Sequence, residues 1–144
     1  MGLTTRKEKR TMLTTETLRT SRRDEMIAIT RQVRAAVQRS GVRDGIAVIY
    51  SPHTTAGITI QENADPDVRH DVLLRLGEVY PWQHPGYRHA EGNTASHLKT
   101  ITAGASQTVI ISGGQLLLGR WQGIYFCEFD GPRTRTYMIK IIAG

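Results

Sequence analysis

The order in which helical and strand patterns follow one another constrains the fold more than any other feature of the sequence. Apolar residues recur at helical spacing only in the first two thirds of the chain, whereas the segment from Ser106 onward has the pattern of successive strands. The Gly113-Gly114 pair marks a tight hairpin turn between two of these strands. Strands segregated from helices in this way predict an α+β fold with a largely antiparallel sheet or sandwich.

Local signals predict two to three helices. Ser21 is expected to cap a helix whose apolar positions are Met26, Ile29, Val33 and Val37 and which ends at Gly41. Asp65 and Pro66 open a second helix that ends before Pro81, and Asn93 is expected to cap a short third helix over 94–103. Strands are predicted over 10–19, 45–51, the β-branched end of 52–60, 107–112, 115–118, 122–129 and 133–142.

The length and composition are those of one globular domain. The chain has 144 residues, of which 39% are hydrophobic and 22% charged. We therefore expect a flexible basic N-terminus over 1–9 and a single domain over 10–144. No apolar run approaches the roughly 20 residues that span a bilayer, and the N-terminus has no secretory signal, so a cytoplasmic protein with no membrane partner is predicted. The single cysteine, Cys127, lies in an apolar strand segment and is expected to be buried.

The net charge of +6 raises the question of nucleic-acid binding. Seven of the Lys and Arg residues fall within residues 6–23, and no basic strand carries the interleaved aromatic residues that stack on bases. The interpretation favoured here is a solvated basic edge and no nucleic-acid partner. The same charge fits a preference for anionic substrates.

The chemistry-bearing residues concentrate between positions 53 and 97. His89, Glu91, Asn93 and His97 fall within nine residues, in the long segment 81–92 and the start of the third predicted helix. His53-Thr54 and Asn63 add polar groups on another loop, and His70-Asp71 lies on the polar face of the second helix. Imidazole with carboxylate is a ligand set that zinc and similar metals prefer. Acid–base catalysis or anion binding without a metal, and purely structural roles, remain open alternatives.

Two other segments have plainer interpretations. The glycine-rich stretch 114–123 lacks the pattern of a phosphate loop, so its glycines are expected at bends, although Trp121 and Gln122 could line a pocket for a planar heterocycle. The charged residues around the Gly131-Pro132 turn are expected to form surface salt bridges; they are Glu128, Asp130, Arg133 and Arg135.

Several of these motifs, in the same order, resemble those of the YjbQ-like proteins, also called the secondary thiamine-phosphate synthase family. The matching segments are His53-Thr-Thr-Ala, Gln61-Glu-Asn-Ala-Asp-Pro-Asp67, Tyr87-Arg-His-Ala-Glu-Gly-Asn93, His97, and Gly114-Gln-Leu-Leu-Leu-Gly-Arg-Trp-Gln-Gly-Ile-Tyr125 followed by Glu128. The resemblance covers the chain from about residue 10 to its end. It implies an α+β subunit, a homotrimer, and a polar site around the histidines.

The resemblance also implies an activity, the joining of hydroxymethylpyrimidine diphosphate to thiazole phosphate. On this sequence it implies that His53, His89 and His97 form the catalytic and metal-binding cluster, with Glu91, Asn63 and Asp71 as ligands or orienting groups. Thr54, Asn63, Asn93, Trp121 and Gln122 are the expected substrate contacts. The expected cofactor is a divalent metal, either zinc or magnesium that accompanies a diphosphate substrate. The alternatives are a metal-dependent hydrolase of phosphorylated metabolites and a non-catalytic anion-binding protein.

Overall fold

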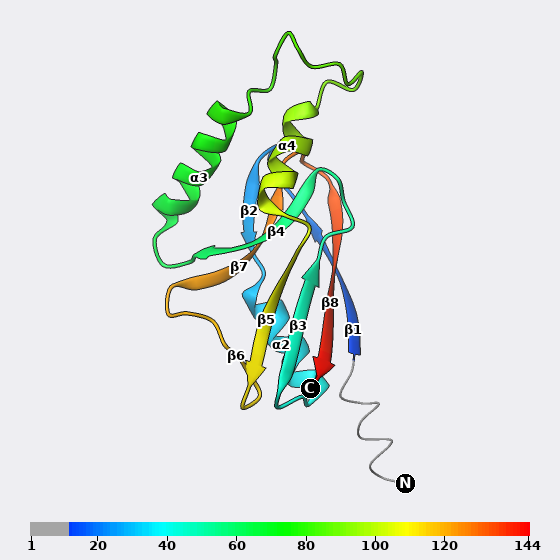
Figure 1. The fold of residues 1–144 in the computed structure, drawn as a ribbon, viewed down its shortest axis with the longest axis vertical. Helices are drawn as coiled ribbons and strands as arrows, with labels where there is room; N and C mark the ends of the chain where they lie inside the picture. The colour runs from blue at the N-terminus through cyan, green and yellow to red at the C-terminus, as the bar shows by residue number, and fades with distance from the viewer. Residues whose placement is uncertain (1–11) are drawn as a thin grey trace.

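A computed structural model describes residues 12–144, so the predicted flexible terminus over 1–9 lies outside the described residues (Figure 1). The larger sheet has the strand order β1-β8-β3-β5-β6, and each strand is antiparallel to its neighbours. The bounds are β1 Met12–Arg19, β3 Gly45–Tyr50, β5 Ser106–Ser112, β6 Gln115–Leu116 and β8 Thr134–Ala143. The smaller sheet has the order β2-β7-β4, from Glu25–Ala28, Gln122–Glu128 and Ala56–Glu62.

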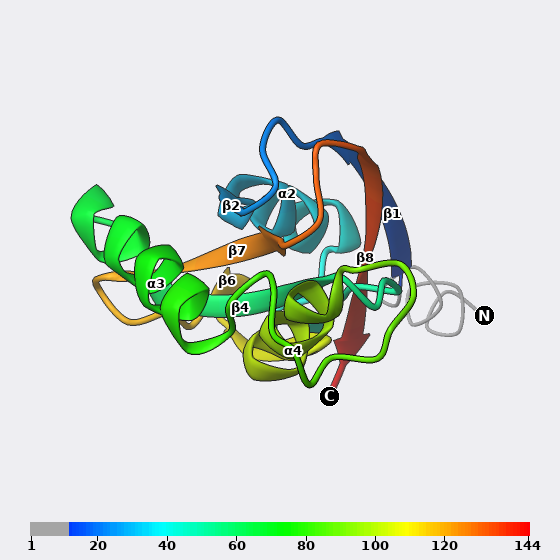
Figure 2. The same ribbon diagram turned by 90° about the horizontal axis from the view of Figure 1, so that it is seen from above.

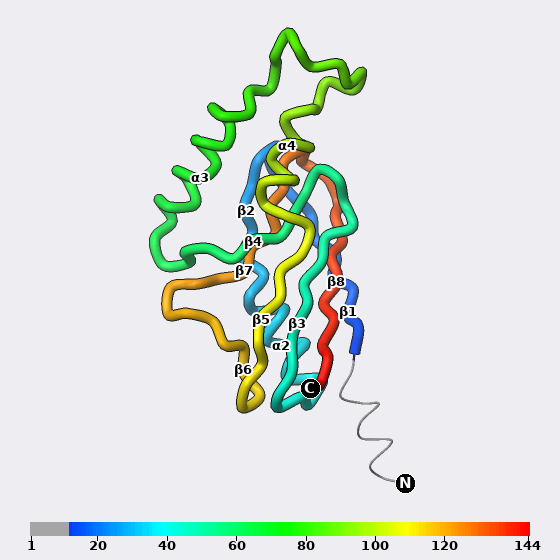
Figure 3. Tube along the Cα trace, viewed as in Figure 1, coloured from blue at the N-terminus to red at the C-terminus, as the bar shows by residue number. Residues whose placement is uncertain are grey.

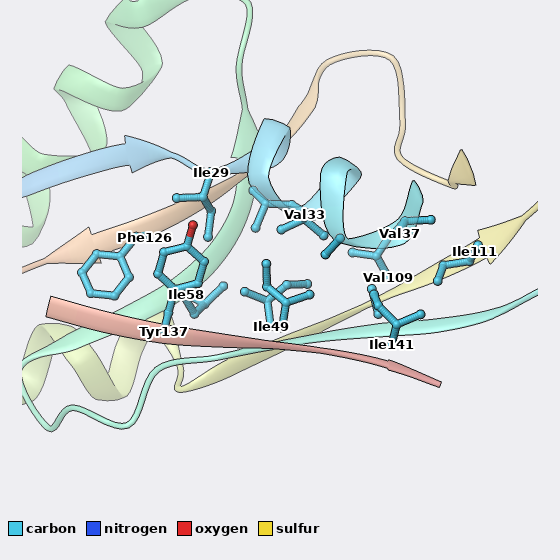
Figure 4. Packing of buried hydrophobic residues seen from close by; sticks show 14 of the residues in the cluster. Ile29, Val33, Val37, Ile49, Ile58, Val109, Ile111, Phe126, Tyr137 and Ile141 are labelled. Carbon is cyan, nitrogen blue, oxygen red and sulfur yellow. The ribbon is translucent and has the colours of Figure 1, made fainter. Parts of the chain in front are cut away.

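Helix α2 (Thr30–Ser40) lies between the two sheets, which curl around it as a half-barrel (Figure 2). Ile29, Val33 and Val37 recur at helical spacing, and they face Ile49 and Ile141 of the larger sheet (Figure 4). Phe126 of the smaller sheet completes the same core, in which each of these side chains is at most 2% exposed. The α+β class with a largely antiparallel sheet is therefore confirmed.

The predicted start of the first helix at Ser21 is wrong. Residues Glu25–Ala28 form strand β2, which pairs with β7, and the helix begins only at Thr30. The acidic side chains that suggested a first turn have other partners: Asp24 pairs with Lys99, and the Glu25 carboxylate accepts bonds from the Ser21 amide and hydroxyl. Tertiary pairing with the edge of a sheet overrides the local helical pattern here.

The other two helices occur where the sequence places them. Helix α3 (Pro66–Val79) follows its N-cap residue Asp65, whose side chain accepts a bond from the Asp67 amide, and none of the helix residues is fully buried. Helix α4 (Thr94–Ala103) follows Asn93, but the Asn93 side chain makes no capping bond, contrary to the prediction. The long loop 80–93 connects the two helices at the top of Figure 3. None of the helices in residues 12–144 is both long and apolar enough to cross a membrane.

Candidate functional site

Polar residues at one end of the smaller sheet line a pocket of about 200 Å³, which we call the histidine pocket. Its walls come from the loop before β4, the loop 80–93, the first turn of α4 and the loop between β7 and β8. The lining residues are Thr54, Thr55, His89, Glu91, Asn93, His97, Asp130 and Arg133. Three stretches that are distant in sequence, 54–55, 89–97 and 130–133, therefore meet at one place.

Two imidazole rings form one wall of the histidine pocket. The rings of His89 and His97 meet edge to face, with centroids 5.2 Å apart and an interplanar angle of 77°. Glu91 Oε1 lies 3.9 Å from His89 Nε2. His97 is held in place because α4 is anchored twice: the Ser96 hydroxyl donates to Phe129 O at 2.7 Å, and the buried Lys99 ammonium donates to Asp24 at 2.8 Å. The predicted association of His89, Glu91 and His97 is thus present in the fold.

Another part of the lining is built on Asp130, which was expected on the surface. Its Oδ2 accepts a bond from Asn93 Nδ2 at 2.8 Å and another from Arg133 Nη2 at 3.0 Å. Arg133 Nε also donates to Asp130 O at 2.9 Å, so the guanidinium is held from two sides. Asp130 and Arg133 are functional candidates that the residue pattern did not single out, since an Asp-x-x-Arg turn usually forms an ordinary surface salt bridge.

A buried ion pair lies behind this wall. Glu128 and Arg135 are 0% and 3% exposed, so the predicted surface salt bridge is wrong for this pair. Arg135 donates to both Glu128 oxygens and to Thr55 Oγ1, and Glu128 also accepts bonds from the Asp130 amide and the Thr20 hydroxyl. Burial alone would raise the pKa of Glu128, but the bonds from Arg135, Asp130 and Thr20 outweigh it and lower that pKa. The network fixes Thr55 and Asp130, which both line the pocket.

His53 lies beside the histidine pocket without lining it. Its Nε2 is 3.0 Å from Thr136 O and 3.1 Å from Thr136 N, so the ring is bound to the backbone of β8. Burial, followed by the nearby charge of Arg135, lowers the pKa of His53. Within residues 12–144, no three His, Cys, Asp or Glu side chains come together as a group able to hold a metal ion. The predicted set of His53, His89 and His97 is therefore not assembled as a ligand triad in this chain.

The remaining predicted site residues lie elsewhere. Asn63, Trp121 and Gln122 sit at the opposite end of the β4–β7 pair, where Glu62 is opposite Gln122, whereas Ala56 is opposite Glu128 at the pocket end. Six residues of strand separate the two ends by roughly 20 Å. Asn63 Oδ1 there accepts a bond from the Tyr125 hydroxyl at 2.8 Å. Asp71 is exposed on α3 and pairs with its neighbour His70 at 3.0 Å. Substrate contact by these residues stays a prediction, separate from the histidine pocket.

Two polar atoms at the start of α4 are buried without a hydrogen-bond partner among the described residues, Asn93 Oδ1 and Thr94 Oγ1. The bond to Asp130 fixes the Asn93 amide with its nitrogen toward the carboxylate. Asn93 Oδ1 is then a hydrogen-bond acceptor with no donor. An unsatisfied buried polar group costs about 1–3 kcal/mol, so a donor that reaches Asn93 Oδ1 would stabilise this end of α4.

Cys127 is buried, as predicted, at 2% exposure. Burial raises the pKa of its thiol to about 12, so a thiolate is scarce at neutral pH. Cys127 therefore belongs to the packing of β7 and does not act as a nucleophile.

The fold and the pocket define a class of protein: one α+β domain, a curled antiparallel sheet, and a polar histidine pocket at the end of the smaller sheet. The family model described as "UPF0047 protein YjbQ-like" matches residues 14–144. The chain belongs to this YjbQ-like family.

Relatives and solved structures agree with this assignment. UPF0047 protein YugU of Bacillus subtilis is 63% identical over 131 residues, which are 91% of this chain and 99% of YugU. A UPF0047 protein of Methanocaldococcus jannaschii is 52% identical over 125 residues, covering 87% of this chain and 90% of the relative. A YjbQ/UPF0047 structure from Clostridium acetobutylicum has a TM-score of 0.88 at 54% identity, and covers 90% of this chain and 99% of its own. A YbjQ-like protein of unknown function from Sulfolobus solfataricus has the same TM-score of 0.88 at 28% identity, and the match covers 93% of this chain and 98% of that protein.

Proposed function

We propose that the histidine pocket is an active site for small phosphorylated molecules. The observation that supports this most directly is the meeting of Arg133, the His89–His97 pair and the first turn of α4 in one polar pocket of about 200 Å³. A guanidinium, protonated imidazoles and a helix N-terminus are groups that favour the binding of an anion.

Arg133 is the principal anion contact in this proposal. Its bonds to Asp130 use Nε and Nη2, and its side chain is 48% exposed, so the guanidinium is oriented but accessible. The hydroxyls of Thr54 and Thr55 lie in the same lining and can donate to phosphate oxygens. The positive end of the helix α4 dipole adds to the attraction because Asn93, which lines the pocket, immediately precedes the helix.

The imidazole pair supplies the acid–base chemistry. Glu91 Oε1 lies 3.9 Å from His89 Nε2, where the carboxylate can orient the imidazole ring. A protonated His89 or His97 can neutralise or protonate the oxygen of a departing phosphate or diphosphate group. Acid catalysis of this kind contributes about 10²–10⁴-fold to a rate.

The specific reaction proposed is the thiamine-phosphate synthase-like transfer that the family resemblance implies. The bond between the pyrimidine methylene carbon and the diphosphate oxygen breaks, and its electron pair leaves with pyrophosphate. The ring nitrogen of thiazole phosphate then donates its lone pair to the methylene carbon, which gives thiamine phosphate. Arg133 and the imidazole pair would stabilise the negative charge that develops on pyrophosphate.

The side chains of the histidine pocket that could bind a metal fit magnesium better than zinc. Zinc sites generally require at least three protein ligands, and the described residues place only His89 and His97 together, with Glu91 nearby. The geometry of the described residues therefore does not favour zinc as the metal of the alternative metal-dependent hydrolase. Magnesium that arrives with a diphosphate needs few protein ligands, and Glu91 offers a carboxylate of the type it prefers.

A homotrimer is also proposed, and the outer face of the larger sheet supports an oligomer. Antiparallel sheets that face water usually carry polar residues on that side. Here the alternation leaves apolar side chains outward on four adjacent strands; they are Leu13, Ile46, Val48, Tyr50, Ile110, Met138 and Ile142. Ile110 is 56% exposed and Tyr50 44%. Light scattering of the purified protein should give three times the chain mass, and the mass of a single chain would contradict the proposal.

The test of the proposed reaction is a direct assay with purified protein, magnesium, hydroxymethylpyrimidine diphosphate and thiazole phosphate. The expected result is thiamine phosphate and pyrophosphate in equal amounts. The matched variants are His97→Gln in the pocket and His70→Gln on exposed α3, and only the first should lose the activity. Release of inorganic phosphate without thiamine phosphate would instead indicate a hydrolase. No turnover, with pyrophosphate still bound, would indicate an anion-binding protein.

A further inference from the structure

A second pocket opens beside the histidine pocket, within the loop 80–93. Its volume is about 390 Å³, and its lining residues are Trp82, Gln83, His84, Tyr87, His89, Glu91, Gly92 and Thr94. We call it the loop pocket. The side chains of Trp82, Tyr87 and two histidines make the loop pocket more aromatic than the histidine pocket. The residues Arg133, Asp130, Thr54 and Thr55 line only the histidine pocket.

The loop pocket is shaped by bonds within its own loop. The Tyr87 hydroxyl donates to Pro81 O at 3.1 Å, the Tyr87 amide donates to His84 O at 3.1 Å, and the Gly92 amide donates to His89 O at 3.1 Å. These bonds close the loop into two turns and hold the Tyr87 ring in a half-buried position. A ligand that binds there meets a preformed surface, which reduces the entropy lost on binding.

One aromatic wall is supported from outside the loop. The Arg23 guanidinium lies 4.0 Å from the centroid of the Trp82 ring, and Arg23 O accepts a bond from the Gly131 amide at 3.1 Å. Cation–π contact with Arg23 occupies one face of the indole and fixes its orientation. Trp82 is half-buried and lines the loop pocket, so the rest of the ring is available to a ligand.

A hydrogen-bond donor stands beside these rings. The Gly86 amide donates to His84 Nδ1 at 2.9 Å, which makes Nδ1 an acceptor and places the proton of the neutral ring on Nε2. The His84 and Tyr87 rings are 5.2 Å apart. A planar ring that stacks on aromatic side chains and accepts one hydrogen bond from an N–H group matches this arrangement, and nitrogen heterocycles have both properties.

The two pockets share His89 and Glu91, so a ligand in one would lie next to a ligand in the other. We propose that the loop pocket is the subsite for a planar nitrogen heterocycle, with Trp82 and Tyr87 as stacking surfaces, while the histidine pocket binds the phosphate or diphosphate of the same or a second molecule. This inference rests on the proposed function and adds to it the residues that select the ring. Thr94, whose buried hydroxyl has no partner in the described part of the chain, lies on the wall of the loop pocket.

The test uses tryptophan fluorescence, because the chain has only two tryptophans, Trp82 and Trp121. Trp121→Phe leaves Trp82 as the single reporter, and the probes are unphosphorylated hydroxymethylpyrimidine, unphosphorylated hydroxyethylthiazole and inorganic pyrophosphate. At least one heterocycle should change the Trp82 emission in a saturable manner. Tyr87→Leu should raise the Kd of that heterocycle about tenfold or more, because loss of one stacking contact between a base and an aromatic ring weakens binding by this order. Tyr87→Phe keeps the ring but loses the hydroxyl bond to Pro81 O, so it should bind the heterocycle more weakly than the parent and more tightly than Tyr87→Leu.

Each outcome separates the loop pocket from the histidine pocket. Arg133→Gln should leave the binding of the unphosphorylated rings unchanged and weaken pyrophosphate. If neither heterocycle binds but pyrophosphate binding still depends on Arg133, the ring subsite is refuted and the proposed function remains. If Tyr87→Leu and Tyr87→Phe bind the heterocycle equally well, stacking on Tyr87 is refuted. If no probe binds at all, both proposals fail.

Discussion

The two ends of the smaller sheet carry similar polar residues but use them differently. At the β4 start, Thr55 and Asp130 are held by a buried ion pair and line a pocket. At the other end, Asn63 bonds to Tyr125, and Trp121 is 54% exposed beside an exposed Gln122. The candidate site thus differs from the far end in the buried polar network behind its exposed groups, and the proposed function depends on that support.

The largest effect is expected from breaking that support. Glu128→Ala or Arg135→Ala leaves one buried charge without its partner, which costs about 3–5 kcal/mol. Urea unfolding should measure this loss in the free energy of unfolding. Arg133→Ala is the matched control, because its ion pair with Asp130 is half-exposed and such pairs contribute at most about 1 kcal/mol. If Arg135→Ala and Arg133→Ala lower the free energy of unfolding equally, the buried pair is no more important for stability than the half-exposed pair of the pocket.

The next effect concerns turnover without a change in stability. His97→Gln should lower kcat at least about 100-fold if the imidazole acts as acid, because this is the lower range of acid catalysis. Its unfolding midpoint should stay close to that of the wild type, since His97 is only partly buried. A variant that loses stability and activity together would indicate a structural role for His97.

His53, which lies beside the histidine pocket, should make the stability of the protein depend on pH. Its pKa in the folded protein is lowered below the ordinary value of 6.5, so the unfolded chain binds the proton more readily. The stability contributed by neutral His53 is fully present above pH 6.5 and is lost as the pH falls through the lowered pKa of the folded state. His53→Gln should flatten the stability curve in that interval, whereas the exposed His70→Gln should not. If His53→Gln has the same pH dependence of stability as the wild type, this dependence does not come from His53.

The smallest effect is expected at the far end of the smaller sheet. Trp121→Ala removes an exposed ring that lines neither pocket, so its stability should change by no more than about 0.5 kcal/mol and its turnover by less than about twofold. A large loss of pyrimidine binding in this variant would show that Trp121 contributes to a site, for example from a second copy of the chain.

The fold followed from the sequence where local signals agreed with the final packing. Asp65 and Pro66 marked the start of α3, and buried residues alternate with more exposed ones along β5 and β8, as expected of strands. The prediction failed at Glu25–Ala28, where pairing with β7 replaced the expected helix. The site was predicted only in part: His89, Glu91 and His97 are close in sequence, whereas Asp130 and Arg133 join them through long-range contacts. Burial of Glu128 and Arg135 depended on the complete fold, so their pattern looked like a surface turn.

The central claim is that an oxyanion binds at the histidine pocket, and calorimetric titration with inorganic pyrophosphate tests it most directly. The wild type, Arg133→Gln and Trp121→Ala should be compared in the same buffer. The account predicts that Arg133→Gln weakens pyrophosphate binding about 10–100-fold, as expected for loss of a charge-assisted hydrogen bond, and that Trp121→Ala leaves it unchanged. Equal affinity in the wild type and Arg133→Gln, or equal losses in both variants, would contradict the account.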